Sequence, residues 1–235
     1  MTLPRPLSAS PGRLIPPDAA IRVVGDVHGD AAAFAAACDT DRFVIQLGDL
    51  TDHGADSAGA LRRALDLRDS GRGVFLLGNH DHKLRRALLG RLSRMDADLS
   101  ATLAALDPAL RARAVEAIGA APAWLRHGGT LFVHGGFHTA MLDNPPPPDA
   151  GARRPDGLVA RALFGETTGR VLADGYPERV YRWVDRIPAG LRVYCGHSVR
   201  ATDGRPLVQR GALGGEAVFV DTGAGKGGHL SWIDL

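Results

Sequence analysis

The amino-acid sequence predicts an α/β protein whose functional site is built by the ends of its strands. Short apolar runs alternate with helical patterns in the N-terminal third of the chain, an order that indicates parallel βαβ units. Six apolar runs lead, directly or across one glycine, into Asp, Asn or His. They are Val23–Val24, Phe43–Leu47, Val74–Leu77, Leu131–Val133, Leu191–Cys195 and Ala217–Val220. Because the carboxyl ends of neighbouring parallel strands meet at one edge of a sheet, these polar residues are expected to form a single site.

Composition and charge narrow the class of protein. The 235 residues, 45% of them hydrophobic, suit one larger domain with a substantial core. A formal net charge of +2 argues against a strong nucleic-acid-binding patch. No apolar run approaches the roughly 18 residues that a spanning helix needs, and the N-terminus does not read as a signal peptide, so we expect a cytoplasmic protein without a membrane partner. Cys38 and Cys195 are expected to be buried free thiols.

An irregular lead-in is expected to precede the first βαβ units. Residues 1–18 contain five prolines and little apolar periodicity, and residues 19–235 are expected to form a single domain. A helix is predicted over about Ala31–Cys38, with Asp30 as its N-cap. A second helix is predicted over about Asp56–Ser70.

The middle of the chain predicts a helical insert. Residues 83–118 are helical in pattern, contain no obvious site residues and are divided at Asp107-Pro108, where the proline suits a first helical turn. The insert is expected either to cover the sheet or to gate substrate. Pro145–Pro148 predicts an exposed, stiff loop, because consecutive prolines fit neither a helix interior nor a strand ladder.

The C-terminal third predicts two short helices and then strands. The helices are expected over about Gly157–Phe164 and about Pro177–Arg186, before the fifth apolar run. From Pro206 onward the pattern is one of short strands separated by Gly-rich turns.

The polar residues at the strand ends predict a metal site. Oxygen and imidazole donors without thiolate favour catalytic divalent ions such as Mn, Fe, Zn, Co or Ni over a structural zinc. Six donors exceed what one open catalytic metal needs, so two ions with a bridging carboxylate fit the count better. Two carboxylates cancel only half of the charge of two such ions, and the remainder favours phosphate and a metal-activated hydroxide near neutral pH. The six donors are Asp26, His28, Asp49, Asn79, His134 and His197.

The same residues lie in motifs that resemble those of the calcineurin-like metallophosphoesterases. The motifs, in order, are Gly25–Gly29, Gly48–Asp52, Gly78–Asp81, His134–Gly136 and Gly196–Ser198. This resemblance implies a four-layer α-β-β-α sandwich with a dinuclear centre, and the helical insert around residues 83–118 would be added to it.

The resemblance also implies how the donors are shared between two ions, with manganese as the expected metal. One ion would be held by Asp26, His28, Asp49 and His197. The other would share Asp49 and add Asn79, which is also expected to meet the substrate, and His134. Whether His134 and His197 exchange neighbours stays open.

Two further residues of the motifs are expected to act in catalysis. By motif position, His80 would be the general acid for the leaving oxygen and Asp52 its carboxylate partner. A carboxylate orients an imidazole and raises its pKa toward the working pH.

Within the family, the chain is most similar to the phosphatase module of bacterial polynucleotide kinase-phosphatase, with the serine/threonine phosphatases nearby. Phe164–Gly169 and Val220–Gly223 carry this likeness, which implies that Asp221 is an accessory carboxylate at the substrate. The Gly-x4-Gly-Lys-Ser/Thr phosphate loop of a kinase half does not occur in the sequence.

One position departs from the family pattern. His53 stands where the relatives usually have arginine. A guanidinium binds phosphate with a charged fork, whereas histidine does so at one point and only when protonated. We therefore expect weaker phosphate binding or a shifted substrate preference at His53, and a more acidic pH optimum.

Together these observations predict a metal-dependent phosphoesterase. The leading hypothesis is a phosphomonoesterase whose partner is a phosphorylated small molecule, a phosphoprotein or a nucleic-acid end. A dinucleoside polyphosphate hydrolase is the alternative enzyme. A non-catalytic metal-binding scaffold is the alternative from another class, and it would have lost metal ligands or the general acid, neither of which is missing here.

Overall fold

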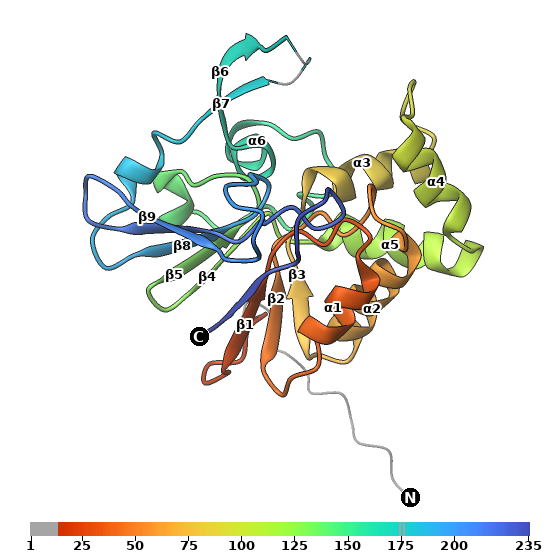
Figure 1. Cartoon of the computed structure of the whole chain (residues 1–235), viewed down its shortest axis with the longest axis horizontal. Helices are drawn as coiled ribbons and strands as arrows, with labels where there is room; N and C mark the ends of the chain where they lie inside the picture. The colour runs from red at the N-terminus through yellow and green to blue at the C-terminus, as the bar shows by residue number, and fades with distance from the viewer. Residues whose placement is uncertain (1–13, 174, 176) are drawn as a thin grey trace, which may run out of the picture.

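Two β-sheets lie face to face at the centre of the molecule, with helices on the outside (Figure 1). The computed structural model describes residues 14–173, 175 and 177–235, so most of the lead-in expected over residues 1–18 lies outside the described residues. No helix in the described part of the chain is long and apolar enough to cross a membrane.

The first sheet contains the predicted βαβ units. α1 (Ala31–Ala37) and α2 (Ser57–Asp69) connect its three parallel strands. Asp30 and Asp56 cap these helices by accepting hydrogen bonds from backbone N–H groups of the first turn. In spatial order the strands are β11 (Trp232–Asp234), β1 (Ile21–Val24), β2 (Phe43–Gln46) and β3 (Gly73–Phe75), with β11 antiparallel.

The second sheet has a parallel centre and antiparallel edges. β5, β8 and β10 are the parallel strands, and each was predicted from its apolar run. The antiparallel edge strand β4 was not predicted. In spatial order the strands are β4 (Trp124–His127), β5 (Thr130–Val133), β8 (Arg192–Cys195), β10 (Glu216–Phe219) and β9 (Leu207–Arg210).

The two sheets bury one face of every central strand against each other. Because successive strand residues point to opposite faces, alternate residues fill this inner layer while their neighbours pack against the outer helices. The inner layer includes Ile21, Val23, Phe43, Ile45, Phe132, Tyr194 and Val218. The outer core includes Val24, Val44, Phe75, Val133, Val193 and Phe219. This is the four-layer sandwich that was expected.

The helical insert is confirmed, although it begins earlier than predicted. α3 (Asn79–Leu88) starts at the end of the third strand, before residue 83. α4 (Ala97–Ala105) follows, and α5 (Pro108–Ala120) begins with Pro108 in its first turn and Asp107 as its N-cap. Leu99, Leu110 and Ile118 anchor α4 and α5 in the core.

The helix predicted over Pro177–Arg186 was wrong. α6 (Gly157–Phe164) ends at Gly165, whose φ of 71° turns the chain into β6 (Glu166–Val171). β7 (Pro177–Val180) pairs antiparallel with β6, and only a 3-10 turn, η2 (Val184–Arg186), follows. Backbone pairing with β6 therefore decided the structure of a segment whose own pattern is ambiguous.

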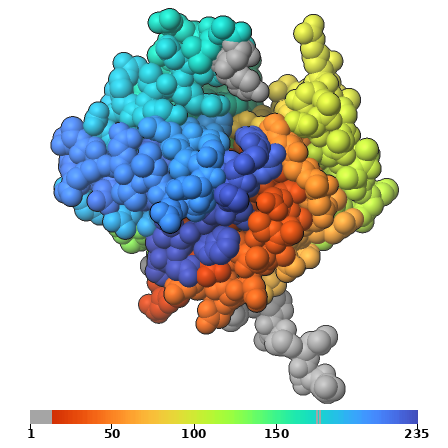
Figure 2. Space-filling view, in the orientation of Figure 1, coloured from red at the N-terminus to blue at the C-terminus, as the bar shows by residue number. Residues whose placement is uncertain are grey.

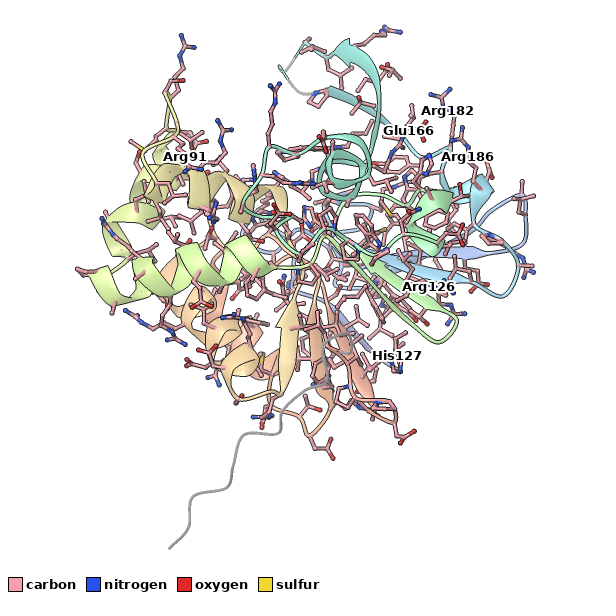
Figure 3. All side chains as sticks on the ribbon, turned by 180° about the vertical axis from the view of Figure 1, so that it is seen from behind. Arg91, Arg126, His127, Glu166, Arg182 and Arg186 are labelled. Carbon is pink, nitrogen blue, oxygen red and sulfur yellow. The ribbon has the colours of Figure 1, made fainter. Side chains whose placement is uncertain are left out.

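The β6–β7 hairpin projects as an arm from the body of the molecule (Figure 1). At its base the buried Glu166 lies 3.1 Å from Arg161 and 3.5 Å from Arg182, and Figure 3 shows Glu166 and Arg182 together there. The arm and the connection between α3 and α4 rise on either side of a notch (Figure 2). Pro145–Pro148 lie outside helices and strands, and the first and last of them are exposed, as predicted.

Candidate metal centre

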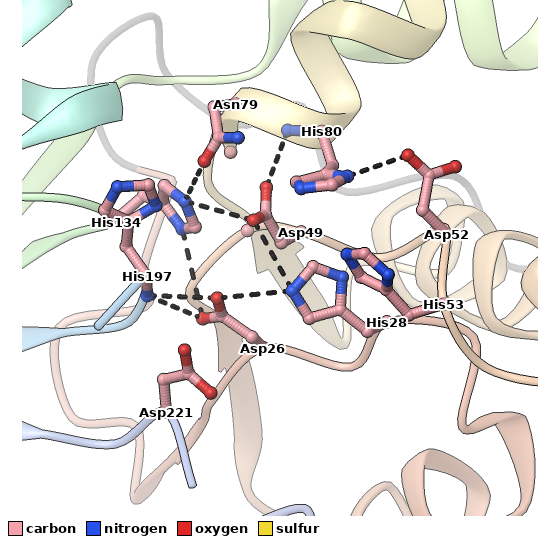
Figure 4. Close-up of polar contacts among 12 residues, drawn as sticks. Asp26, His28, Asp49, Asp52, His53, Asn79, His80, His134, His197 and Asp221 are labelled. Carbon is pink, nitrogen blue, oxygen red and sulfur yellow. Dashed lines mark hydrogen bonds and ion pairs between the residues drawn. The ribbon is translucent and has the colours of Figure 1, made fainter. Parts of the chain in front are cut away.

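The strand-end residues predicted from the sequence come together in one cluster (Figure 4). They arrive from the ends of β1, β2, β5 and β8 and from the first turn of α3. The cluster consists of Asp26, His28, Asp49, Asn79, His134 and His197, all buried except Asn79, which is half-buried.

Glycines let the backbones that deliver these side chains approach closely. A Cβ at Gly196 would collide with the carboxylate of Asp26, and one at Gly78 would collide with Asp49. Only glycine leaves room for the carboxylates at these points, so the glycine that precedes His197 or Asn79 belongs to the construction of the site.

The first group of donors is Asp26, His28 and Asp49, which offer donor atoms within 4.8 Å of one another. His28 Nε2 lies 3.9 Å from Asp26 Oδ2 and 3.7 Å from Asp49 Oδ2. His28 Nδ1 lies 3.1 Å from the carbonyl oxygen of Thr51. Because a carbonyl only accepts, Nδ1 donates and the lone pair of Nε2 faces the two carboxylates.

The second group is Asp49, His134 and His197. His134 Nδ1 donates to the carbonyl oxygen of Leu47 at 2.9 Å, so its Nε2 carries the lone pair. That Nε2 nevertheless lies 3.0 Å from Asn79 Oδ1 and 3.4 Å from Asp49 Oδ2. Three acceptor atoms face one another there, a contact that a bound cation or a proton on Nε2 makes favourable.

His197 links the two groups. Its ring lies 4.9 Å from that of His134, centroid to centroid, while its backbone N–H donates to Asp26 Oδ2 at 3.0 Å. The sequence left open which ion each of these histidines serves, and this geometry places His197 beside both groups.

The electrostatics of the buried cluster favour the binding of a cation. Burial, reinforced by the charge of Asp221, raises the pKa of Asp26 well above its usual range. Burial lowers the pKa of His28 to about 3. Burial also disfavours the charged form of His134, but the charges of Asp49 and Asp26 outweigh this effect and raise its pKa to about 9. A buried carboxylate that attracts a proton as strongly as Asp26 also attracts divalent ions. At Asp49 burial is outweighed by the charges of His134, His80 and His28, which keep its pKa well below the usual range.

The donor set fits the metal ions that the sequence predicts. His28 Nε2, His197 Nε2 and Asp221 Oδ2 are buried and have no hydrogen-bond partner among the described residues. Buried polar atoms normally have one. Unpaired imidazole nitrogens and carboxylate oxygens that converge without thiolate form a donor set for catalytic divalent ions.

An imidazole–carboxylate pair lies beside the cluster, as predicted. His80 Nδ1 lies 2.7 Å from Asp52 Oδ2, and the backbone N–H of His80 donates to Asp49 Oδ1 at 2.8 Å. Burial lowers the pKa of His80, but the charges of Asp49 and Asp52 outweigh it, so the pKa is raised. Burial raises the pKa of Asp52, but hydrogen bonds from His80, Lys83 and Thr102 reverse this and lower it to about 2.

Comparison with known families identifies this arrangement. The sequence model of the family described as calcineurin-like phosphoesterase matches residues 19–199, most of the chain. The chain belongs to the calcineurin-like phosphoesterase family. It is therefore a hydrolase of phosphate esters in a family that depends on a dinuclear metal centre, and the two His/Asp groups that share Asp49 agree with that centre.

Two curated relatives of this phosphoesterase are both named bis(5′-nucleosyl)-tetraphosphatases. The chain is 26% identical over 234 residues to an asymmetrical bis(5′-nucleosyl)-tetraphosphatase PrpE of Geobacillus thermodenitrificans, covering 90% of this chain and 88% of the relative. It is 29% identical over 205 residues to a symmetrical bis(5′-nucleosyl)-tetraphosphatase of Ralstonia nicotianae, covering 83% and 64%.

Solved structures confirm the fold. A crystal structure of a candidate diadenosine tetraphosphatase has a TM-score of 0.62 at 21% identity, covering 94% of this chain and 91% of the other. A serine/threonine phosphatase of Saccharomyces cerevisiae has a TM-score of 0.57 at 16% identity, covering 87% and 68%.

His53 of this phosphoesterase lies among the site histidines. Its ring is 4.8 Å from that of His28 and 5.1 Å from that of His80, centroid to centroid. Its Nδ1 lies 2.7 Å from Asp98 Oδ2 of α4. Burial and the positive charge of Lys226 lower the pKa of His53, so its imidazole is neutral at physiological pH.

Asp221 also reaches the cluster, from the end of β10 (Figure 4). Its Oδ1 accepts from the backbone N–H of Gly223, and its Oδ2 is unpaired. The Gly-rich turn after it carries Lys226, which is exposed. Gly225 brings this turn into contact with His28 and Gly54.

Sequence reasoning missed several residues of the site. Asp81 is fully buried and accepts the backbone N–H groups of Asp49 at 2.8 Å and Gly78 at 3.0 Å, so it fixes the loop that presents Asp49. Lys83 and Thr102 bind Asp52 from the insert that was expected to contain no site residues. Only Lys83 carried a signal, as one of two lysines in the chain.

Proposed function

We propose that this phosphoesterase hydrolyses a dinucleoside tetraphosphate. The sequence alone favoured phosphomonoesters and kept dinucleoside polyphosphates as the alternative. The names of the curated relatives, which match 83% or more of this chain in both examples reported above, support that alternative. A nucleotide substrate also agrees with the cytoplasmic location expected from the sequence.

The observation that carries the reaction type is the position of Asp49 between two imidazoles. Its Oδ2 lies 3.7 Å from His28 Nε2 and 3.4 Å from His134 Nε2, and its Oδ1 is fixed by the backbone N–H of His80. One carboxylate placed in this way suits two ions better than one.

We assign the metal ligands accordingly. One ion would be held by Asp26, His28, Asp49 and His197, and the other by Asp49, Asn79 and His134, with manganese as the first metal to test. When bound, these ions supply the positive charge that binds phosphate oxygens and acidifies a water molecule for attack on phosphorus.

His80 is assigned as the general acid. Asp52 holds the proton of Nδ1, so the proton on Nε2 is the one available to the leaving oxygen. Because the side chain of His80 is 17% exposed whereas that of Asp52 is fully buried, the imidazole can contact substrate while the carboxylate of Asp52 stays excluded from solvent. The low pKa of Asp52 keeps the carboxylate charged throughout.

Lys226, His53 and Asp221 are assigned to the substrate. The charge of Lys226 lowers the pKa of both His28 and His53, and the contact of Gly225 with His28 brings its turn to the site. An exposed ammonium at this position suits the phosphate chain, while a neutral His53 offers a hydrogen bond rather than a charge.

The test uses purified protein with added manganese, supplied in turn with diadenosine tetraphosphate, p-nitrophenyl phosphate and a phosphopeptide. We expect cleavage of the tetraphosphate, abolished in Asp49→Ala and slowed in His80→Ala. Chromatography separates asymmetrical cleavage, which yields ATP and AMP, from symmetrical cleavage, which yields two ADP.

Each outcome decides between the hypotheses. Release of orthophosphate from the monoesters with an intact tetraphosphate would return the assignment to a phosphomonoesterase. Manganese binding with no turnover of any substrate would support the non-catalytic scaffold.

A further inference from the structure

The helical insert contacts the His80–Asp52 pair through the second turn of α4. Thr102 is 2% exposed, and its Oγ1 donates to Asp52 Oδ1 at 2.8 Å. Asp52 is 1% exposed and uses its other oxygen, Oδ2, for His80. The carboxylate is thus held at both ends, by the imidazole that it orients and by a helix outside the sequence motifs.

Thr102 is itself fixed within a small hydrogen-bonded ring. Its Oγ1 lies 3.2 Å from Ser57 Oγ at the start of α2. Ser57 Oγ accepts the backbone N–H of Asp52 at 3.0 Å. The backbone and side chain of Asp52 are therefore connected to one another through two buried hydroxyl groups, which removes its freedom to rotate.

A second connection ties the N-terminus of α4 to the same carboxylate. Asp96 caps the helix by accepting from the backbone N–H of Leu99 at 2.9 Å. Lys83 Nζ lies 2.9 Å from Asp96 Oδ2 and 3.0 Å from Asp52 Oδ2. The helix cannot move away from Asp52 without breaking either this bridge or the bond from Thr102.

We propose that Thr102 is a positioning residue for the general acid, acting through Asp52 on His80. This inference rests on the role assigned to His80 under the proposed function. It extends the machinery of the reaction to α4, a segment that the sequence assigned only to covering the sheet or gating substrate.

The bond from Thr102 matters because Lys83 and His80 both bind Asp52 Oδ2. Without a donor at Oδ1, the carboxylate is free to rotate toward Lys83 and to release the imidazole from its orientation. A general acid must lie within hydrogen-bond reach of the leaving oxygen, and small displacements of such a group are costly in rate. The loss should therefore fall on the step that needs the proton.

The experiment compares two substrates of one enzyme, phenyl phosphate and p-nitrophenyl phosphate. Phenolate is the more basic leaving group and needs the proton more. We expect Thr102→Val, which keeps the shape of the side chain, to lower kcat for phenyl phosphate by about tenfold or more and for p-nitrophenyl phosphate much less, with KM unchanged for both. Thr102→Ser keeps the hydroxyl and should restore both rates.

The controls separate positioning from folding. Ser100→Ala removes a hydroxyl of the same helix whose one hydrogen bond among the described residues goes to the carbonyl oxygen of Asp96, and it should leave both rates unchanged. If Thr102→Val does not fold, Thr102→Ala removes the same donor to Asp52 Oδ1 and should give the same preference between leaving groups.

Two results would overturn the proposal. Equal losses for both substrates in Thr102→Val would show a merely structural role for Thr102. The proposed function would still stand if His80→Ala lowered the rate for phenyl phosphate more than the rate for p-nitrophenyl phosphate. An equal loss in His80→Ala would remove the general acid itself, and with it the role of Thr102.

Discussion

Five residues of the site hold a backbone conformation that ordinary side chains avoid. His28, Asp49, Asp52, His53 and His197 have φ angles between 44° and 73°, and they are the non-glycine residues with positive φ in the described ranges. This conformation costs on the order of 1 kcal/mol or more for each residue. The surrounding hydrogen bonds must outweigh this strain, so part of the stability of the fold is used to hold the donors in place.

Replacing His53 with arginine should strengthen phosphate binding. The neutral imidazole of His53 gains a charge only as the pH falls, because its pKa is lowered below the ordinary value, whereas a guanidinium stays charged. We expect His53→Arg to lower KM severalfold and to move the pH optimum upward, measured from KM and kcat profiles with a phosphate-ester substrate. His53→Gln is the control, since it keeps a hydrogen-bonding group without charge. Unchanged KM and pH profile in His53→Arg would contradict the role given to this position.

The two cysteines should be inert in the native protein. Cys38 is 5% exposed and Cys195 is fully buried. Burial raises the pKa of the Cys38 thiol to about 11 and that of Cys195 well above its usual range. Since the thiolate is the reactive form and exists only as the pH approaches the pKa, a disulfide reagent at pH 8 should label neither residue until urea unfolds the chain. Rapid labelling of the native Cys195→Ser variant would show that Cys38 is accessible.

At the scale of elements, the sequence predicted those helices and strands whose own pattern of apolar and polar residues identifies them. A strand buried on both faces is a continuous apolar run, and the polar residue after it marks its end, as at Val24 and Asp26. β4 and β6 carry no such signal, because β4 is an edge strand in which only Trp124 is buried and β6 is exposed beyond Glu166. Backbone pairing with β5 and β7 determines that these two segments become strands.

The polar contacts of the insert were hidden for a related reason. Thr102 contacts a residue 50 positions earlier, and an isolated threonine on a helix gives no indication of so distant a partner. Asp98 meets His53 in the same way. Patterns read along the chain reveal which face of a helix is buried, whereas the identity of the partner depends on how the helices pack.

The β6–β7 arm should depend on one buried carboxylate. Glu166 Oε2 lies 3.1 Å from Nη1 of Arg161 in α6, and Oε1 lies 3.5 Å from Nη2 of Arg182, so Glu166→Gln leaves a partly buried guanidinium without a counter-charge. We expect the variant to lose about 1–3 kcal/mol of unfolding free energy, measured by urea denaturation. Arg182→Ala is the matched control, because the side chain of Arg182 is 67% exposed and its removal should cost less than about 1 kcal/mol. Equal losses in the two variants would contradict the importance of the buried partner.

At the scale of the whole molecule, the candidate metal centre lies where the two sheets meet. The first sheet presents Asp26, His28 and Asp49, and the second presents His134 and His197. An ion bound between these groups adds a further connection between halves of the fold that also touch through apolar side chains and through hydrogen bonds such as that of His197 to Asp26. Metal binding should therefore stabilise the entire domain and not only the loops that carry the ligands.

Removal of metal should lower the Tm of the protein as a single unit. A ligand that binds only the folded state at 100 times its Kd adds about 2.7 kcal/mol of stability, so manganese should raise the Tm measured by calorimetry and excess chelator should lower it. Residues 19–235 are expected to unfold in one transition under both conditions, because one core connects the helices of the insert to both sheets. Asp49→Ala removes the carboxylate shared by both groups, and its Tm should not respond to manganese. Two separate transitions in the metal-free protein would contradict a single domain, and a manganese response that persists in Asp49→Ala would place the ions elsewhere.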